Sequence, residues 1–342
     1  MKLIKGAQMK LSIVVPCYNE EEVISELYQR ASNVCKSLKE KYELILVNDG
    51  SNDRTWYLIH ELASNDPNVV GVTLTRNHGH QLALSAGLSI CNGERIFIID
   101  ADLQDPPELL PEMMRLMDEG ADVVYGKRTK RRGETWLKKF TAALFYRLLN
   151  FLTDIDIPID TGDFRLISRR VLEVLNGMPE HHRFIRGMVS WTGFKHAALN
   201  YERDERFAGQ TKYPLKKMIR FAFDAITSFS IRPLKFASSL GILFAILGLI
   251  GLIYALVSWI SGITVPGWTS VIITSMILGS SQLLVLGIFG EYLGRLYIES
   301  KRRPLYIIDR ILSQGGEEIW KENLKSKIII IENPLVRKNY NS

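Results

Sequence analysis

The chain has 342 residues, a formal net charge of +6 at pH 7 and an apolar fraction of 46%. That length is typical of about two domains, and the basic excess favours anionic partners such as phosphorylated substrates or lipid headgroups. Cys17, Cys35 and Cys91 are odd in number and lack metal-ligand spacing, which argues against a disulfide framework and indicates a reducing compartment.

Short apolar runs rich in β-branched residues alternate with helical patterns through the first part of the chain, which predicts a parallel sheet with helices on both faces. The first helix is expected to start with a capping box in which Asn19 is the N-cap and Glu22 the N3 residue. The sequence contains neither a G-x-G-x-x-G fingerprint nor a P-loop. We predict strands at 11–15, 42–47, 69–74, 96–99 and 121–125, and helices at 19–39, 53–63, 79–90 and 107–117.

Polar or turn-forming residues follow three of these strands, at 16–20, 48–51 and 100–102. Because the carboxyl ends of parallel strands meet at one edge of a sheet, where ligands bind in open α/β folds, the three segments are expected to share a site.

Asp100 and Asp102 end the predicted strand at 96–99. Carboxylates this close repel each other unless a cation lies between them. Mg²⁺ and Mn²⁺ take oxygen ligands and often keep nucleotide phosphates among them, and Gln104 can add an amide oxygen. The residues alone leave a second interpretation open, an acidic loop that caps the helix starting near Pro107.

Two segments, 135–152 and 212–235, combine basic and aromatic residues. The first fits both a helix lying in a membrane interface and a helix packed on its own sheet. The second leads directly into a long apolar segment, so we predict that it is interfacial.

Two uncharged segments, 236–260 and 268–290, are each long enough to cross the ~30 Å hydrocarbon core of a bilayer. The connection at 261–267 is also uncharged, whereas both outer flanks are basic, which places the N-terminal domain and both termini in the cytoplasm. Small residues in the spans and an apolar strand predicted at 328–331 indicate a homo-oligomer.

Four motifs occur in the order of a known family: VVPCYNE at 14–20, VNDGSNDRT at 47–55, DADLQDPP at 100–107 and GDFRL at 162–166. With them the chain resembles the GT-A-fold, family 2 glycosyltransferases. Within that family it is similar to the polyprenyl-phosphate glycosyltransferases, which include dolichyl-phosphate mannose synthases and bacterial bactoprenol glucosyltransferases. The two apolar segments and RFAGQTKY at 206–213 match the bacterial branch best, and the resemblance covers roughly residues 9–300.

The resemblance implies a fold and a domain order. We expect an α/β, Rossmann-like GT-A catalytic domain with a mostly parallel sheet at 1–211, followed by interfacial helices at 212–235. Two transmembrane helices joined by a short external loop should fill 236–293, and a cytoplasmic tail 294–342.

The resemblance also implies roles for individual residues. Asp163 lies where the family places a residue close to the acceptor, and we expect Asp163 and Asp102 to be catalytic. Base and ribose are expected to contact Pro16, Tyr18, Glu20 and Asp49, with Asp100 also at the nucleotide. Asp100, Asp102 and Gln104 are expected to hold Mg²⁺ or Mn²⁺ and the diphosphate. The candidates for phosphate contacts are Arg128, Arg165, Arg169, Arg206 and Lys212, and a buried structural role is the alternative for Arg165 and Arg169.

The expected activity is inverting, metal-dependent transfer of glucose from UDP-glucose to undecaprenyl phosphate by a multi-pass enzyme of the inner (plasma) membrane. The partners are a nucleotide sugar, a polyprenyl phosphate, the bilayer and further copies of the chain, and not nucleic acid. The alternatives are GDP-mannose with a dolichyl-type phosphate, a processive polysaccharide synthase, and a non-catalytic two-span channel or flippase subunit. The synthase lacks support because the chain has no Q-x-x-R-W motif.

Overall fold

The computed structural model describes residues 9–128, 161–202, 230, 232–262, 267–313 and 316–319. These residues belong to two compact units. The first contains 9–128 and 161–202, together with the residues described after Arg303. The second contains residue 230 and the long helices between 232 and 303.

The first unit is built on a sheet whose described strands follow the order β7-β5-β6-β4-β1-β2-β3-β8-β9. The central strands β4, β1, β2 and β3 are parallel, as the alternation of strands and helices predicts. The strand bounds are Leu11–Cys17 (β1), Tyr42–Asn48 (β2), Val69–Leu74 (β3), Arg95–Ile98 (β4), Val123–Arg128 (β5), Thr161–Ser168 (β6), His196–Tyr201 (β7), Ile308–Ser313 (β8) and Gly316–Ile319 (β9).

Antiparallel pairing occurs on both sides of this parallel centre. On one side β6 inserts between β4 and β5 and runs antiparallel to both, and β7 then pairs parallel to β5. On the other side β8 pairs antiparallel to β3, and β9 pairs with β8. The strands that the alternating pattern did not predict, β6, β7, β8 and β9, all lie outside the parallel centre formed by β4, β1, β2 and β3.

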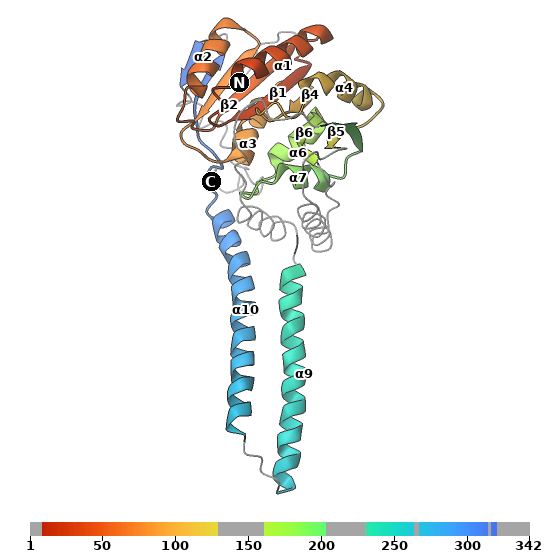
Figure 1. The fold of residues 1–342 in the computed structure, drawn as a ribbon, viewed down its shortest axis with the longest axis vertical. Coiled ribbons are helices and arrows are strands. Elements are labelled where there is room, and N and C mark those ends of the chain that lie inside the picture. The colour runs from red at the N-terminus through yellow and green to blue at the C-terminus, as the bar shows by residue number, and fades with distance from the viewer. Residues whose placement is uncertain are drawn as a thin grey trace, which may run out of the picture. The chain divides into compact units, whose positions relative to one another are not determined.

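Helices cover both faces of the sheet (Figure 1). Helix α1 contacts both α2 and α4 on one face, and α3 packs against β1 and β2 on the other, next to α6. The bounds are Ile24–Leu38 (α1), Thr55–Asn65 (α2), His80–Ile90 (α3), Pro107–Leu109 (the 3₁₀ helix η1), Leu110–Asp118 (α4), Arg169–Gly177 (α6) and Ile185–Trp191 (α7).

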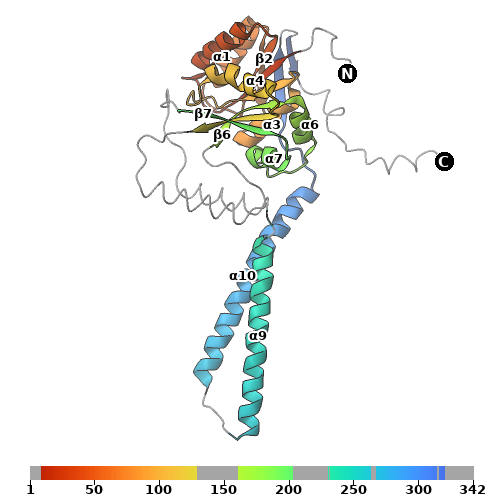
Figure 2. The same ribbon diagram turned by 90° about the vertical axis from the view of Figure 1, so that its right-hand side faces the viewer.

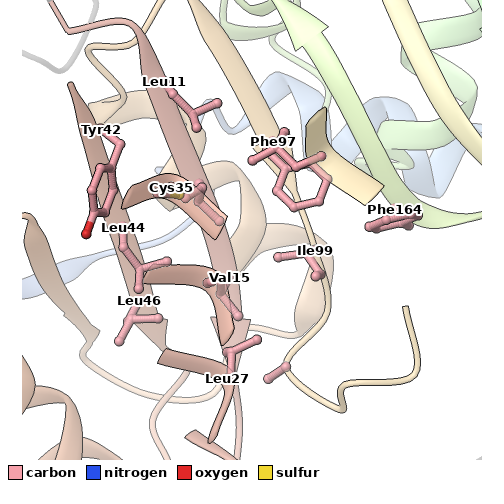
Figure 3. Close-up of a cluster of buried hydrophobic side chains, with 14 of the residues drawn as sticks. Leu11, Val15, Leu27, Cys35, Tyr42, Leu44, Leu46, Phe97, Ile99 and Phe164 are labelled. Atoms are coloured by element: carbon pink, nitrogen blue, oxygen red, sulfur yellow. The ribbon is translucent and has the colours of Figure 1, made fainter. Parts of the chain in front are cut away.

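The main apolar core lies between the sheet and the layer that contains α1 (Figure 3). Alternate residues of β1, including Leu11 and Val15, point into it, because side chains on a strand alternate between faces. Leu27 and Cys35 fill it from α1, and Phe97 continues it on β4. Burial on both faces explains why β1 and β2 are mostly apolar.

The second unit contains the helices α9 (Arg232–Ile260) and α10 (Trp268–Ser300), which lie side by side (Figure 2). Both are long and apolar enough to cross a membrane. Their large apolar side chains are mostly exposed, with Met276 at 70% and Leu283 at 71%. The predicted spans at 236–260 and 268–290 thus fall within two continuous helices.

The predicted α/β class and its mostly parallel sheet are confirmed. The predicted capping box is wrong, because α1 begins only at Ile24 and Asn19 adopts a left-handed φ of 54°. The helix predicted at 135–152, most of the interfacial segment at 212–235 and the strand at 328–331 lie outside the described residues.

Candidate active site

The loops after β1 and β2 are tied together at the carboxyl edge of the sheet. The Asn19 N–H donates to Ser51 Oγ at 3.0 Å, and the Asn52 N–H donates to Asn19 Oδ1 at 2.9 Å. Asn19 therefore crosslinks two loops instead of capping a helix. The predicted nucleotide contacts Pro16, Tyr18 and Glu20 lie at this end of β1, with Pro16 buried and Tyr18 36% exposed.

Asp49, at the end of β2, fixes the loop that leads into α3. Its two carboxylate oxygens accept hydrogen bonds from the backbone N–H groups of His78 at 2.7 Å and Gly79 at 2.9 Å. Burial raises the pKa of Asp49, although these two hydrogen bonds oppose the shift. Asp49, predicted to bind the nucleotide, therefore positions the start of α3 in the fold.

The acidic loop after β4 turns tightly. Leu103 has a left-handed φ of 56°, and the Gln104 N–H donates to Asp102 Oδ1 at 3.2 Å. Asp100 Oδ1 is buried and makes no hydrogen bond. Desolvation and the neighbouring carboxylates raise the pKa of Asp100 to about 6.

Strand β6 brings Asp163 to the same edge. Arg165 pairs with Ile98 across the antiparallel ladder, so Asp163 lies level with Asp100, just beyond the end of β4. The position of the motif around Asp163 therefore depends on pairing between strands that are distant in sequence. We name Asp100, Asp102 and Asp163 together the carboxylate cluster.

The first residues of α3 reach into the carboxylate cluster. His80 Nε2 lies 3.3 Å from Asp100 Oδ1 and 3.5 Å from Asp163 Oδ2, and Gln81 Nε2 donates to Asp163 Oδ2 at 2.8 Å. Desolvation acts to lower the pKa of His80, but the two carboxylates outweigh it and raise the pKa to about 9. The two carboxylates thus favour the protonated form of His80.

Two arginines face the other oxygen of Asp163. Arg165 Nη2 lies 3.5 Å and Arg186 Nη2 3.6 Å from Asp163 Oδ1. Burial acts to raise the pKa of Asp163, but Arg186, His80 and Arg165 hold it well below its usual range. Burial lowers the pKa of Arg165 to about 10, which leaves it charged at pH 7.

The residues predicted to contact phosphate do not all lie at the carboxylate cluster. Arg128 lies near the acidic loop, but its Nη2 is 3.3 Å from the fully buried Asp105 and its Nε donates to the Tyr201 hydroxyl at 3.2 Å. Arg169 is not brought to the carboxylate cluster. It follows the end of β6 that pairs with the start of β4, and its guanidinium donates to the carbonyl groups of Cys91 and Gly93. Arg206 and Lys212 lie outside the described residues.

His80, Gln81 and Arg186 were missed by the sequence reasoning. His80 and Gln81 follow the polar loop after β3. The expectation that polar residues after parallel strands share a site, which selected the segments after β1, β2 and β4, therefore also applies to them. Arg186 carries no such local signal, because α7 reaches the site only through tertiary packing.

Among the described residues, no group of three or more His, Cys, Asp or Glu side chains could hold a metal ion alone. Asp100 and Asp102 nevertheless offer carboxylate oxygens. Asp100 Oδ1 is buried and makes no hydrogen bond, and its nearest charged neighbour is His80 Nε2 at 3.3 Å. Mg²⁺ is commonly bound by one or two carboxylates together with substrate phosphates and water. The acidic loop fits a divalent cation that takes its remaining ligands from a diphosphate.

Comparison with known proteins identifies the family. Residues 12–175 match the model described as Glycosyl transferase family 2. The chain is 50% identical over 315 residues to "Uncharacterized glycosyltransferase YkcC" of Bacillus subtilis (strain 168), a match that covers 92% of this chain and 98% of that protein. The chain belongs to glycosyltransferase family 2. The predicted family, enzyme class and GT-A fold are confirmed.

Other relatives carry more specific names. This glycosyltransferase is 40% identical over 301 residues to the bactoprenol glucosyl transferase of Shigella phage SfV, a match that covers 88% of this chain and 98% of that protein. A crystal structure of glucosyl-3-phosphoglycerate synthase from Mycobacterium tuberculosis with Mn²⁺, UDP-glucose and phosphoglyceric acid is 21% identical, with a TM-score of 0.42. That match covers 64% of this chain and 78% of the other.

Proposed function

We propose that this glycosyltransferase moves glucose from UDP-glucose to undecaprenyl phosphate at the cytoplasmic face of the membrane, with inversion and with a divalent metal. The observation that carries the proposal is the carboxylate cluster, where Asp163 from β6 lies level with Asp100 from β4 and is surrounded by cations. The name of the relative from Shigella phage SfV supports the glucosyl group and the bactoprenol acceptor.

The donor half of the proposed site is the acidic loop together with the ends of β1 and β2. Asp100, Asp102 and Gln104 would hold Mg²⁺ or Mn²⁺, which would stabilise the charge of the leaving diphosphate. Tyr18 and Asp49 lie at the adjoining strand ends, consistent with contacts to the base and ribose.

The acceptor half is centred on Asp163. A phosphate monoester is already largely ionised at pH 7, with a second pKa of about 6. The surrounding cations keep the pKa of Asp163 low, which makes its carboxylate a weak base. Asp163 therefore orients the acceptor and the neighbouring cations, and proton abstraction contributes little.

Chain connectivity supports the proposed membrane topology. Helix α9 has 29 residues and α10 has 33, which gives lengths of roughly 43 Å and 50 Å at 1.5 Å per residue. After α10 the chain returns to the first unit, where β8 pairs with β3. A chain that leaves and rejoins one sheet crosses a membrane an even number of times, so two spans keep the catalytic unit and β8 on one side.

The direct test is transfer of radiolabelled sugar into lipid that can be extracted with organic solvent. UDP-glucose, UDP-GlcNAc and GDP-mannose would each be offered with undecaprenyl phosphate, with and without EDTA. We expect labelling from UDP-glucose that Mg²⁺ or Mn²⁺ restores, and none with undecaprenol, which lacks the phosphate. Labelling from GDP-mannose alone would replace the donor, and the absence of labelled lipid with every donor would refute the function.

A further inference from the structure

Arg186 has hydrogen-bond donors that no described residue uses. Its Nη2 lies 3.6 Å from Asp163 Oδ1, which is too far for a hydrogen bond, and its Nε is buried without a partner. The guanidinium lies over the ring of Phe184, 5.8 Å from the centroid, and the side chain is 19% exposed. Arg186 is thus positioned beside the carboxylate cluster and is accessible from solvent.

Among the described residues, the other two arginines near the acidic loop and Asp163 already have close partners. Arg165 is 3% exposed, and its Nη2 donates to the Gly162 carbonyl at 3.0 Å. Arg128 contacts Asp105 and the Tyr201 hydroxyl. Of these three arginines, Arg186 is therefore the one with N–H donors available to bind an anion.

Gln81 fixes the position of Arg186 relative to Asp163. The Gln81 side-chain amide donates to Asp163 Oδ2 at 2.8 Å, and its Oε1 accepts a hydrogen bond from the Ile185 N–H at 3.0 Å. The Gln81 side-chain amide thus connects Asp163 to Ile185, the residue before Arg186.

We infer that Arg186 binds a phosphate group of a substrate, and this inference rests on the proposed function. A guanidinium presents five N–H donors in a fixed fork that matches phosphate geometry. An anionic substrate that approaches three carboxylates needs compensating charge, and Arg186 supplies it next to Asp163. The phosphate belongs either to the acceptor monoester or to the diphosphate of the donor.

Binding measurements on the full-length protein in detergent separate these two sources. Calorimetric titrations would use UDP with Mn²⁺, farnesyl phosphate, and farnesol as the phosphate-free probe. For Arg186→Gln we expect the affinity for UDP or for farnesyl phosphate to fall about 10-fold to 100-fold, the range for a lost charge-assisted hydrogen bond. Farnesol binding should not change, and Arg186→Lys should restore part of the loss because it keeps the charge without the fork.

The matched control is Arg183→Gln. Arg183 lies three positions earlier and donates to the backbone carbonyl groups of Leu175 and Met178, so its replacement should leave both affinities unchanged. A weaker UDP affinity would assign Arg186 to the diphosphate, and a weaker farnesyl phosphate affinity would assign it to the acceptor.

Unchanged affinities for both ligands in a folded Arg186→Gln variant would overturn the inference. If Arg186→Gln does not fold, unchanged affinities in Arg186→Met, which keeps much of the side-chain length without charge or N–H donors, would overturn it. Absence of sugar transfer by the wild-type protein would refute the proposed function, while the titrations would still decide the role of Arg186.

Discussion

Replacing Asp163 by Asn tests whether this carboxylate compensates the buried cations around it. Asp163 is 7% exposed, and Arg165 and Arg186 lie 3.5 Å and 3.6 Å from its Oδ1. Removing one partner from a buried ion pair commonly costs about 3–5 kcal/mol. Because Asn keeps the side-chain volume and an oxygen for Gln81, and because Arg186 is partly solvated, we expect the lower end, about 3 kcal/mol.

The assay is thermal unfolding of the full-length protein in detergent. At about 2–4 °C per kcal/mol for a unit of this size, the expected decrease in Tm is roughly 6–12 °C. Glu119→Gln is the control, because Glu119 forms an exposed ion pair with Arg115 one helical turn away, and such pairs contribute about 0.3–0.5 kcal/mol. If Asp163→Asn melted within about 2 °C of this control, the proposed charge compensation would be refuted.

Transfer kinetics separate this stabilising role from the role in the reaction. Asp163→Asn is expected to slow transfer to the lipid phosphate and to leave the affinity for UDP with Mn²⁺ nearly unchanged. Since the pKa of Asp163 is held low, the wild-type rate should rise little above pH 7. A rate that increased steeply between pH 7 and pH 9 would indicate a general base after all.

Four further outcomes are expected. Asp102→Asn should weaken metal-dependent UDP binding, measured by calorimetry, and should lower the transfer rate about 10²–10³-fold, because it removes charge from the proposed cation site. Burial and Arg165 lower the pKa of His196, so the unfolded chain binds a proton at this residue more readily than the folded chain does. The free energy of unfolding should therefore fall as the pH drops below about 6.5. In denaturant titrations at a series of pH values, His196→Gln should reduce this pH dependence. A cysteine that replaces the exposed Ser261 should react with a membrane-impermeant thiol reagent added to intact cells, and one that replaces the exposed Ser313 should not. Background labelling should be low because the three native cysteines are buried. The reverse labelling pattern would invert the proposed topology. The protein should be a homo-oligomer in detergent that deletion after Gln314 weakens, and light scattering that gave a monomeric mass for the full chain would contradict this.

The sequence predicts the parallel centre of the sheet well because its signals are local. Strand β3 has the predicted bounds, and β1 and β2 each extend a residue or two past their predicted ends. Pro16, expected to end β1, instead lies inside it, paired with Val47 on the β2 side. The β4 ladder stops at Val14, so β4 has no ladder bond at Pro16 that needs the missing N–H.

Other features depend on contacts that no local pattern encodes. The GDFRL motif was identified by resemblance, but its place as an antiparallel strand beside β4 depends on a partner more than sixty positions away in sequence. Asn19 fits a capping pattern, yet Ser51 and Asn52 bind it in the fold. Of the site residues that sequence reasoning missed, Arg186 is brought to the site by packing between distant elements, whereas His80 and Gln81 follow a strand end to which the local rule applies.

The position of α3 links these observations, because this helix carries both His80 and Gln81. Close packing sets its distance from the sheet: a Cβ atom on Gly87 would lie 2.4 Å from Val14 Cγ1, so only glycine fits there. Asp49 holds the backbone just before its first turn.

The chain that returns after α10 adds a third restraint near the same helix. Ile307 accepts a hydrogen bond from the Thr75 N–H at 3.1 Å, at the start of the loop that leads to α3. The Tyr306 hydroxyl lies 3.5 Å from the Ser85 carbonyl of α3 itself. The segment after α10 therefore supports the helix that presents His80 and Gln81 to the carboxylate cluster. A catalytic fragment that ended before α9 would lack this support and would leave β3 as an unpaired edge strand.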